Sequence, residues 1–177
     1  MKAFFEEVLT RFEPISKPAS YEKGALLQSA GTTCYNLFLV QSGALRSFYY
    51  VEERDVTAHF ALEYGIVGAA DSIIRGTQSR YCIEALESSV VIVLDYRSLE
   101  SFLAQNPHLE RLARQFTQYL YIDLVERLEE RAFCTARERY THLLKRHPDI
   151  TQRLSLGHIA SYLGITQETL SRVRAQR

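Results

Sequence analysis

The sequence predicts an α+β protein with a β domain, a long helix and a small helical domain, in that order along the chain. Between residues 21 and 96, short β-branched and aromatic runs alternate with breaks that contain glycine or serine, as in a β sandwich or barrel. From residue 109 onward, apolar residues recur every three or four positions, which indicates one long helix. The last roughly 40 residues carry the cap signals of short helices. We therefore divide the chain into residues 1–105, 106–134 and 135–177.

The elements of the first domain follow from local patterns. Residues 1–12 are expected to form a leading helix, and SLESFLAQ a short helix after the last strand. Asn106 is expected to cap the next helix, with Pro107 at its first position, where a missing N–H costs nothing. The strand-like runs are NLFLV, ALRSFYYV, DVTAHFAL, RYCIEAL and SSVVIVLD.

The long helix carries an apolar stripe that some surface must cover. The stripe packs either on the β domain of its own chain or on a second copy of itself. We favour the second copy, because Tyr119, Tyr121 and Ile122 widen the apolar surface beyond what one β face would cover. The residues expected at this dimer seam are Leu109, Leu112, Phe116, Tyr119, Leu120, Leu124 and Leu128.

Composition and charge limit the function classes. Apolar residues make up 46% of the chain, but no run approaches the roughly 20 apolar residues of a membrane span, so we expect a cytoplasmic protein with no membrane partner. The three cysteines lie far apart and are expected to be reduced thiols rather than metal ligands. From residue 136 onward there are eight Lys or Arg against three Asp or Glu, although the whole chain is neutral. This asymmetry suggests that only the C-terminal domain meets a polyanion.

Cap signals divide the C-terminal domain into helices. Thr135 and Glu138 form a capping-box signature, and Pro148 is expected to end the helix that they begin. In LSLGHIASYLGITQETLSRVRAQR, Ser155 can cap one helix and Thr166 a second, with Gly164 in the turn between them. The spacing predicts a helix-turn-helix.

The outward face of the second helix has the composition of a helix that contacts bases in a major groove. Gln can address adenine, Glu accepts from cytosine, and Arg pairs with guanine, while Thr and Ser reach phosphates. The alternatives are a helical hairpin with a solvated face and a tip that binds another protein. We favour DNA, and the residues expected to contact it are Thr166, Gln167, Glu168, Thr169, Ser171, Arg172 and Arg174.

At this point the chain resembles the Crp/Fnr family of bacterial transcription regulators from end to end. QETLSR resembles the recognition-helix signature of the family, which maps base contacts onto Glu168 and Arg172; the first position is commonly Arg and is Gln167 here. KGALLQSAG and LFLVQSGALRSFY resemble the hairpins of the family's double-stranded β-helix, a jelly roll, and residues 107–134 resemble its dimerisation helix. The resemblance implies a homodimer, with double-stranded DNA and RNA polymerase as partners. The family continues into a β wing, whereas this sequence ends at Arg177. If Arg177 is the natural end of the protein, we expect the phosphate contacts of the wing to be missing and DNA binding to be weaker.

The resemblance also raises the question of a cyclic nucleotide. Members that bind one hold its ribose with Gly-Glu and its phosphate with Arg-Ser, but this chain has Gly68-Ala69 and Ser79-Arg80 at those places. Arg80 begins the expected strand RYCIEAL, so the shift by one residue turns its side chain to the opposite face, away from the pocket. Because burying a phosphate without a cation is costly, we expect no tight binding of cyclic AMP or cyclic GMP.

A small pocket remains in this region, and two interpretations of it stay open. It is either a filled core or the site of an unidentified neutral or hydrophobic effector. Its expected lining is Phe60, Val67, Gly68, Ala69, Asp71, Ser72, Ser79, Arg80 and Tyr81.

Other cofactors and enzyme activity find no support in the sequence. Cys34 is isolated, which argues against an iron–sulfur cluster, and His59 is the lone candidate haem ligand of the β domain, where a packed core histidine is the more ordinary role. A jelly-roll enzyme of the cupin kind would need several histidines around a metal. We therefore expect no cofactor and no enzyme activity.

Overall fold

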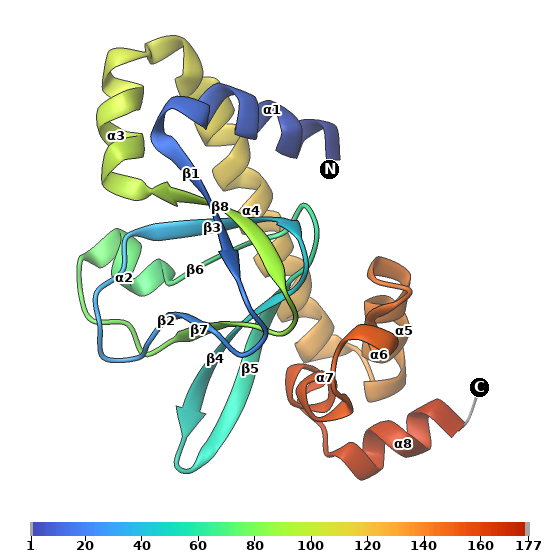
Figure 1. The fold of residues 1–177 in the computed structure, drawn as a ribbon. Coiled ribbons are helices and arrows are strands. Elements are labelled where there is room, and N and C mark those ends of the chain that lie inside the picture. Colours follow the sequence, from blue (N-terminus) through green and yellow to red (C-terminus); the bar gives the residue numbers. More distant parts are fainter. Residues whose placement is uncertain (1, 176–177) are drawn as a thin grey trace. The chain divides into compact units, whose positions relative to one another are not determined.

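The computed structural model describes residues 2–175, which form two compact units divided between Leu112 and Ala113. Figure 1 shows the strands gathered in the first unit and the short helices of the second. The expectation about the β wing concerns the chain from Arg177 onward, and Arg177 lies outside the described residues. Among residues 2–175, no helix is long and apolar enough to cross a membrane.

The first unit contains eight strands and the helices that flank them. Its helices are α1 (Lys2–Phe12), α2 (Ala70–Arg75) and α3 (Tyr96–Gln105), with single 3-10 turns at Glu13–Ile15 and Pro107–Leu109. Its strands are β1 (Ser16–Tyr21), β2 (Leu26–Gln28), β3 (Asn36–Ser42), β4 (Leu45–Val51), β5 (Arg54–Ala61), β6 (Ile66–Gly68), β7 (Cys82–Ala85) and β8 (Ser89–Asp95). Each strand-like run of the sequence therefore contains an observed strand.

The strands form two four-stranded antiparallel sheets, in the orders β1-β8-β3-β6 and β2-β7-β4-β5. Consecutive strands alternate between the sheets for most of the chain, which is the topology of a jelly roll. A common apolar core takes side chains from both sheets: Cys34, Phe38, Val40, Leu45, Ala61, Val67, Ile83, Ala85 and Val91 are all buried. The predicted fold class is confirmed.

Two local features show why these residues suit their strands and turns. Pro18 lies in β1, an edge strand, where its missing N–H costs no hydrogen bond to a second neighbour. Gly43 turns the chain from β3 into β4 with φ of +94°, and a Cβ there would come within 2.7 Å of the Ser88 carbonyl oxygen. Only glycine fits this turn without strain.

A buried arginine pairs with two carboxylates on the sheet that contains β4. The Arg46 side chain forms ion pairs with Asp55 and Glu84, and its Nη1 donates to Thr57 Oγ1 at 3.1 Å. Its guanidinium also lies over the Phe48 ring, 4.2 Å from the ring centroid. A buried charge is tolerated only when it is paired in this way, so the network favours one register of β4 against β5 and β7.

Two side chains near the ends of α3 act as helix caps, and Asn106 differs from the expectation. Asp95 begins α3, because its Oδ1 accepts a hydrogen bond from the Ser98 N–H at 2.8 Å. Asn106 does not cap the following helix: its Nδ2 donates to the Phe102 carbonyl oxygen at 2.9 Å, which closes the end of α3 instead. The prediction for Asn106 was therefore wrong, whereas Pro107 does begin the next helical turn.

The second unit contains most of the long helix and the four helices that follow it. These are α4 (Glu110–Phe133), α5 (Ala136–Arg146), α6 (Ile150–Arg153), α7 (Leu156–Leu163) and α8 (Gln167–Ala175). The predicted capping box is present: Thr135 Oγ1 accepts from the Glu138 N–H, and the Glu138 carboxylate accepts from the Thr135 N–H. The Thr135 N–H and the Thr135 hydroxyl both donate to the Glu138 carboxylate, and these two bonds lower the pKa of the Glu138 carboxyl.

Candidate nucleic-acid interface and effector pocket

The short helices of the second unit enclose an apolar core, and α8 packs on both α5 and α7. Leu170 is the buried residue of α8, with no exposed surface. Ile159, Leu163 and Leu170 are buried, while Ile165 and Val173 are half-buried. Between residues 134 and 175 the buried residues are Tyr140, Leu143, Ile150, Leu154, Ile159, Ala160, Leu163 and Leu170.

The predicted caps and turn of the helix-turn-helix are confirmed. Ser155 Oγ accepts from the His158 N–H at 3.1 Å, and Thr166 Oγ1 accepts from the Thr169 N–H at 3.2 Å. Gly164 has φ of +67°, the left-handed conformation that ends a helix, and Ala160 beside the turn is buried. These local bonds fix where α8 begins.

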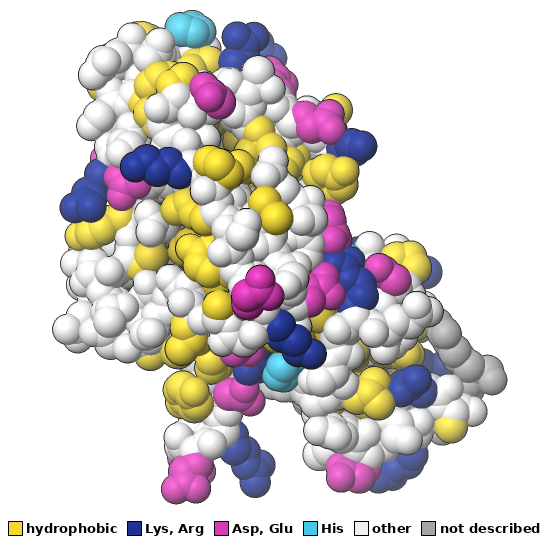
Figure 2. Space-filling model, in the orientation of Figure 1, with side chains coloured by type: hydrophobic (Ala, Val, Ile, Leu, Met, Phe, Trp, Pro, Cys, Tyr) yellow, Lys and Arg dark blue, Asp and Glu magenta, His cyan; other side chains and the backbone are white. Residues whose placement is uncertain are grey.

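The outer face of α8 carries the side chains that the sequence assigned to DNA. Thr169 is half-buried, and the exposed ones are Thr166, Gln167, Glu168, Ser171, Arg172 and Arg174. Figure 2 shows acidic and basic side chains together on this helix. The pKa of the Glu168 carboxyl is lowered, first by the Thr166 hydroxyl and to a smaller extent by Arg172, so the carboxylate is ionised near neutral pH and can accept hydrogen bonds.

Gln167 has a position that sequence reasoning did not foresee. A Cβ placed on Gly157 would lie 2.8 Å from Gln167 Nε2, so the amide of Gln167 rests against the first turn of α7. The side chain is still exposed. Gly157 therefore provides the space in which Gln167 can lie beside α7.

The expected effector pocket is only partly present. An open hollow of about 730 Å³ lies beside α2, and of the nine predicted residues it is lined by Asp71, Arg80 and Tyr81. Five others, Phe60, Val67, Ala69, Ser72 and Ser79, are buried in the β domain. A Cβ on Gly68 would come within 2.9 Å of the Ile73 and Leu37 side chains. The predicted lining is therefore corrected: these six residues do not line the hollow, because they are packed among the side chains behind it.

Beside the hollow, the Asp71 carboxylate is surrounded by hydrogen-bond donors from Ser72, Ser79 and Arg80, and we call this group of donors the cradle. Its Oδ1 accepts from the Ser79 hydroxyl and from the Ser72 N–H, both at 2.9 Å, and its Oδ2 accepts from the Arg80 N–H at 3.3 Å. Backbone N–H groups and hydroxyls that converge on one point hold anions. Here a side chain of the protein is the anion.

Arg80 lies in the loop before β7, not in a strand, so the expected argument from strand alternation does not apply to it. Its side chain is exposed, donates to the Tyr81 hydroxyl at 3.1 Å, and lies over the rings of Tyr49 and Tyr81. The guanidinium is thus held on the outer rim of the hollow.

His59 bonds to the backbone of the β domain, and the three cysteines are buried or half-buried. His59 is half-buried, with Nε2 3.2 Å from the Ile66 carbonyl oxygen. Cys34 and Cys82 are buried, Cys134 is half-buried, and all three are free thiols. Burial raises the pKa of the Cys34 thiol, which disfavours the reactive thiolate. Among the described residues, no three His, Cys, Asp or Glu side chains are grouped to hold a metal ion.

The apolar stripe of α4 is not one continuous face. Leu109, Leu112 and Phe116 are buried within the single chain, whereas Leu124 and Leu128 are 47% and 57% exposed. Tyr119 and Leu120 are half-buried. Steps of four residues advance by about 40° around a helix, so the two ends of the stripe point in different directions.

The predicted seam stays a prediction, and its exposed part is Leu124 and Leu128. Together with Tyr121 they form an exposed apolar face, at the spacing of three and four residues that a helix pair uses. We call these three residues the α4 seam.

Comparison with known proteins agrees with this architecture. Residues 18–106 match the family model described as the cyclic nucleotide-binding domain. The fumarate and nitrate reduction regulatory protein of Vibrio cholerae is 26% identical, over 95% of this chain and 69% of that protein. The structure of FixK2 from Bradyrhizobium japonicum aligns with a TM-score of 0.76 at 23% identity, over 92% of this chain and 84% of that one. The structure of a CooA mutant from Carboxydothermus hydrogenoformans aligns with a TM-score of 0.69 at 22% identity, over 96% of this chain and 82% of that one.

A jelly-roll domain of the cyclic nucleotide-binding type, followed by a long helix and a helix-turn-helix, defines a class of regulators with a sensory domain and a separate helical tip. The chain belongs to the Crp/Fnr family of transcription regulators.

Proposed function

We propose that the chain acts as a homodimer that binds an inverted-repeat DNA duplex, with one α8 in each of two successive major grooves. The observation that carries the proposal is the face of α8, where exposed Glu168, Arg172 and Arg174 stand on a helix whose caps and core are complete. Membership of a family of dimeric, DNA-binding regulators supports it. The proposed place of action is the cytoplasm, where bacterial DNA lies, and RNA polymerase is a proposed second partner.

The exposed side chains of α8 divide into two roles. Glu168 and Arg172 lie one helical turn apart, and we assign them to bases, because a carboxylate accepts from cytosine and a guanidinium pairs with guanine. Arg174 and the hydroxyls of Thr166, Thr169 and Ser171 are assigned to phosphates, with Gln167 beside α7 at the edge of this face. The seam residues Tyr121, Leu124 and Leu128 join the two protomers.

The test of this function is selection from a randomised duplex pool at two salt concentrations, followed by sequencing of the bound fraction. We expect enrichment of an inverted repeat and an affinity that falls steeply with salt, because neutralised phosphates release counterions. Failure to enrich any sequence at either salt concentration would refute DNA recognition. If the helical tip bound a protein partner and its affinity depended little on salt, the alternative function, a tip that recognises protein, would be supported.

Two arginine variants are expected to separate the roles assigned to α8. Arg172→Ala should cost about 1–3 kcal/mol of binding free energy and relax the preference at one base position of each half-site. Arg174→Ala should weaken binding to all sequences alike and reduce the salt slope by about one for each protomer. The measurement is a titration of the selected duplex and its single-base variants with both proteins. Equal binding of every duplex by both variants and the wild type would contradict the assignment.

We further propose that neither cyclic AMP nor cyclic GMP controls the protein. Ala69 is fully buried and has no carboxylate to hold a ribose, and the Asp71 carboxylate already accepts the hydrogen bonds of Ser79 and Arg80. A cyclic phosphate in that cradle would meet a negative charge instead of free donors. An unidentified effector in the outer hollow remains a proposal.

The expected result is an unchanged thermal unfolding midpoint when either nucleotide is added at millimolar concentration. A ligand that binds only the folded state raises stability by RT ln(1 + [L]/Kd), so a saturating rise in the midpoint would contradict this prediction. Asp71→Asn is the matched variant, since it removes the charge and keeps the shape of the side chain. A nucleotide that stabilises the variant alone would identify the Asp71 charge as the barrier.

A further inference from the structure

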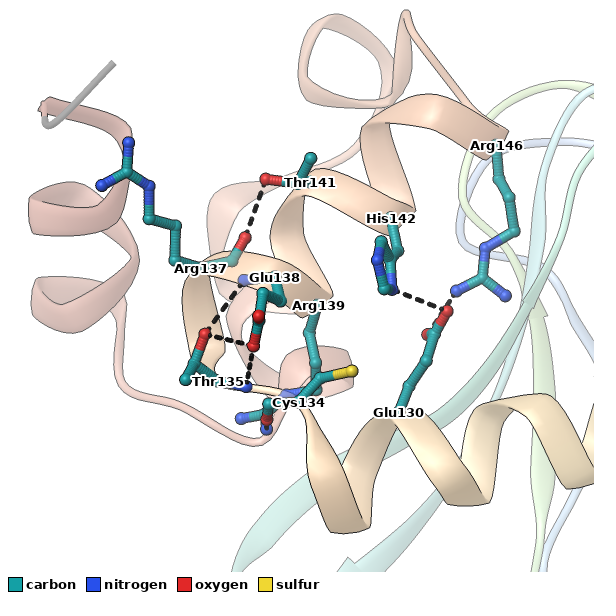
Figure 3. Close-up of polar contacts among 9 residues, drawn as sticks. All are labelled: Glu130, Cys134, Thr135, Arg137, Glu138, Arg139, Thr141, His142 and Arg146. Carbon is teal, nitrogen blue, oxygen red and sulfur yellow. Dashed lines mark hydrogen bonds and ion pairs between the residues drawn. The ribbon is translucent and has the colours of Figure 1, made fainter.

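The junction between α4 and the helix-turn-helix is short and is held by an arginine. α4 ends at Phe133 and α5 begins at Ala136, so two residues, Cys134 and Thr135, turn the chain. Arg139 of α5 donates from Nη1 to the Cys134 carbonyl oxygen at 2.6 Å (Figure 3) and from Nε to the Leu163 carbonyl oxygen at 3.1 Å. One guanidinium therefore holds both the junction and the end of α7.

A second arginine reaches the same end of α7 from the long helix. Arg131 of α4 donates from Nη2 to the Tyr162 carbonyl oxygen at 3.1 Å. Tyr162 and Leu163 are the last residues of α7, and the carbonyl groups at the end of a helix carry partial negative charge. Two cations thus bind the end of α7 directly before Gly164, the residue that turns the chain towards α8.

A third contact fixes the outer side of the same junction. Glu130 of α4 accepts from His142 Nδ1 at 3.2 Å and forms an ion pair with Arg146, both from α5 (Figure 3). The capping box of Thr135 and Glu138 lies at the start of α5 in the same view. The direction of α5 relative to α4 is therefore set by contacts on two sides of the junction.

We infer that Arg139, together with Arg131, is a positioning residue that sets the direction of α8 relative to the α4 seam and thereby the half-site spacing that the dimer accepts. The inference rests on the proposed function. In a dimer joined through α4, the separation of the two α8 helices depends on the angle at each junction, and that separation must match the repeat of the DNA helix.

Arg139 differs from the arginines of α8 in what its donors contact. It is half-buried, and its Nε and Nη1 donate to backbone carbonyl groups, whereas Arg172 and Arg174 are exposed. Loss of Arg139 should therefore change geometry and leave the number of phosphate contacts unchanged. A planar guanidinium can donate in two fixed directions at once, which a lysine cannot do.

The first test uses inverted repeats whose half-sites are separated by spacers that differ by single base pairs. For Arg139→Gln we expect a roughly tenfold or greater loss of affinity at the preferred spacing, because hydrogen bonds from a charged group contribute about that factor. The preference among spacings should flatten, while base preference and salt slope stay as in the wild type. Arg139→Lys should behave like Arg139→Gln, and Arg131→Gln should show the same effect to a smaller degree.

Lys145→Gln is the matched control, because Lys145 is an exposed cation on the same helix. It removes one charge and should leave the spacing preference unchanged. An unchanged spacing preference in folded Arg139→Gln and Arg139→Lys would overturn the inference, as would a reduced salt slope, which would make Arg139 a phosphate contact.

A second test does not require DNA. A spin label at Ser171→Cys, in a Cys134→Ser background, reports the distance between the two α8 helices of a dimer. We expect one narrow distribution in this background and a broad one when Arg139→Gln is added. A distribution that stays narrow would overturn the inference, whereas the expected broadening in a protein that selects no duplex would uphold it and refute the proposed function alone.

Discussion

Replacement of both Leu124 and Leu128 by glutamate is expected to convert the protein to a monomer. The two side chains are 47% and 57% exposed and lie within about 40° of each other around α4, next to Tyr121. In a two-fold dimer each contributes twice, and each leucine that a second copy buries contributes about 1.5–3 kcal/mol. The dissociation constant of the dimer should rise by more than about a thousandfold, which sedimentation of the purified variant will measure.

The same variant should lose most of its affinity for the full operator. A monomer contacts one half-site, and linking two binding modules raises affinity by roughly 10²- to 10⁴-fold without any new contact. Binding to an isolated half-site should change little. The comparison of full-site and half-site duplexes therefore separates loss of the dimer from damage to α8.

Ile122→Glu is the matched control for the seam. Ile122 is 53% exposed on the same helix, but it lies about 140° around the axis from the midpoint of Leu124 and Leu128. This variant should remain a dimer. Dissociation of Ile122→Glu to the same extent would show that the dimer uses another face of α4, and a dimeric double glutamate variant would exclude the α4 seam.

The features that the sequence predicted well are local ones. Thr135 and Glu138, Ser155, and Thr166 each bond within three residues, so their chemistry is visible in a short window of sequence. Gly164 likewise marks its own turn. Five of the eight described strands were found for the same reason, because β-branched runs and turn residues alternate at short range, whereas β1, β2 and β6 were not among the predicted runs.

The features that the sequence could not predict join distant residues. Arg46 lies in a strand-like run, but its ion-pair partners are 9 and 38 residues away, and Arg139 bonds a carbonyl 24 residues away. Asn106 was misassigned because the same amide can close one helix or open the next. The direction of the stripe was also hard to see in the sequence, because leucines four residues apart look like one stripe in sequence and rotate around the helix in space.

The pocket combines one feature that was visible in the sequence with one that was not. The absence of a glutamate at Ala69 was visible in the sequence, and it motivates the proposed indifference to cyclic nucleotides. The role of Asp71 was not visible, since its bond to Ser79 depends on how the loop between α2 and β7 folds back. Asp71 was expected to line the pocket, and it does so as the anion that occupies the cradle.

Leu170→Ala is expected to destabilise the helix-turn-helix more than any exposed change in α8. Leu170 is fully buried where α8 packs on α5 and α7, and its loss leaves a cavity in a small core. Leucine-to-alanine changes of this kind cost about 2–5 kcal/mol, a large share of the 5–15 kcal/mol that typically stabilises a domain. Amide hydrogen exchange should therefore accelerate throughout α5, α7 and α8, while the β sheets keep their protection.

Two variants make this prediction specific to packing. Leu170→Met conserves volume and should cost less than about 1.5 kcal/mol, and Ser171→Ala, at the exposed neighbour, should stay within about 0.5 kcal/mol. Because α8 must stay in place to contact both strands of a groove, Leu170→Ala should also weaken binding to every duplex alike. Wild-type exchange rates in Leu170→Ala would mean that α8 is held mainly by its caps and by the contacts at the end of α7.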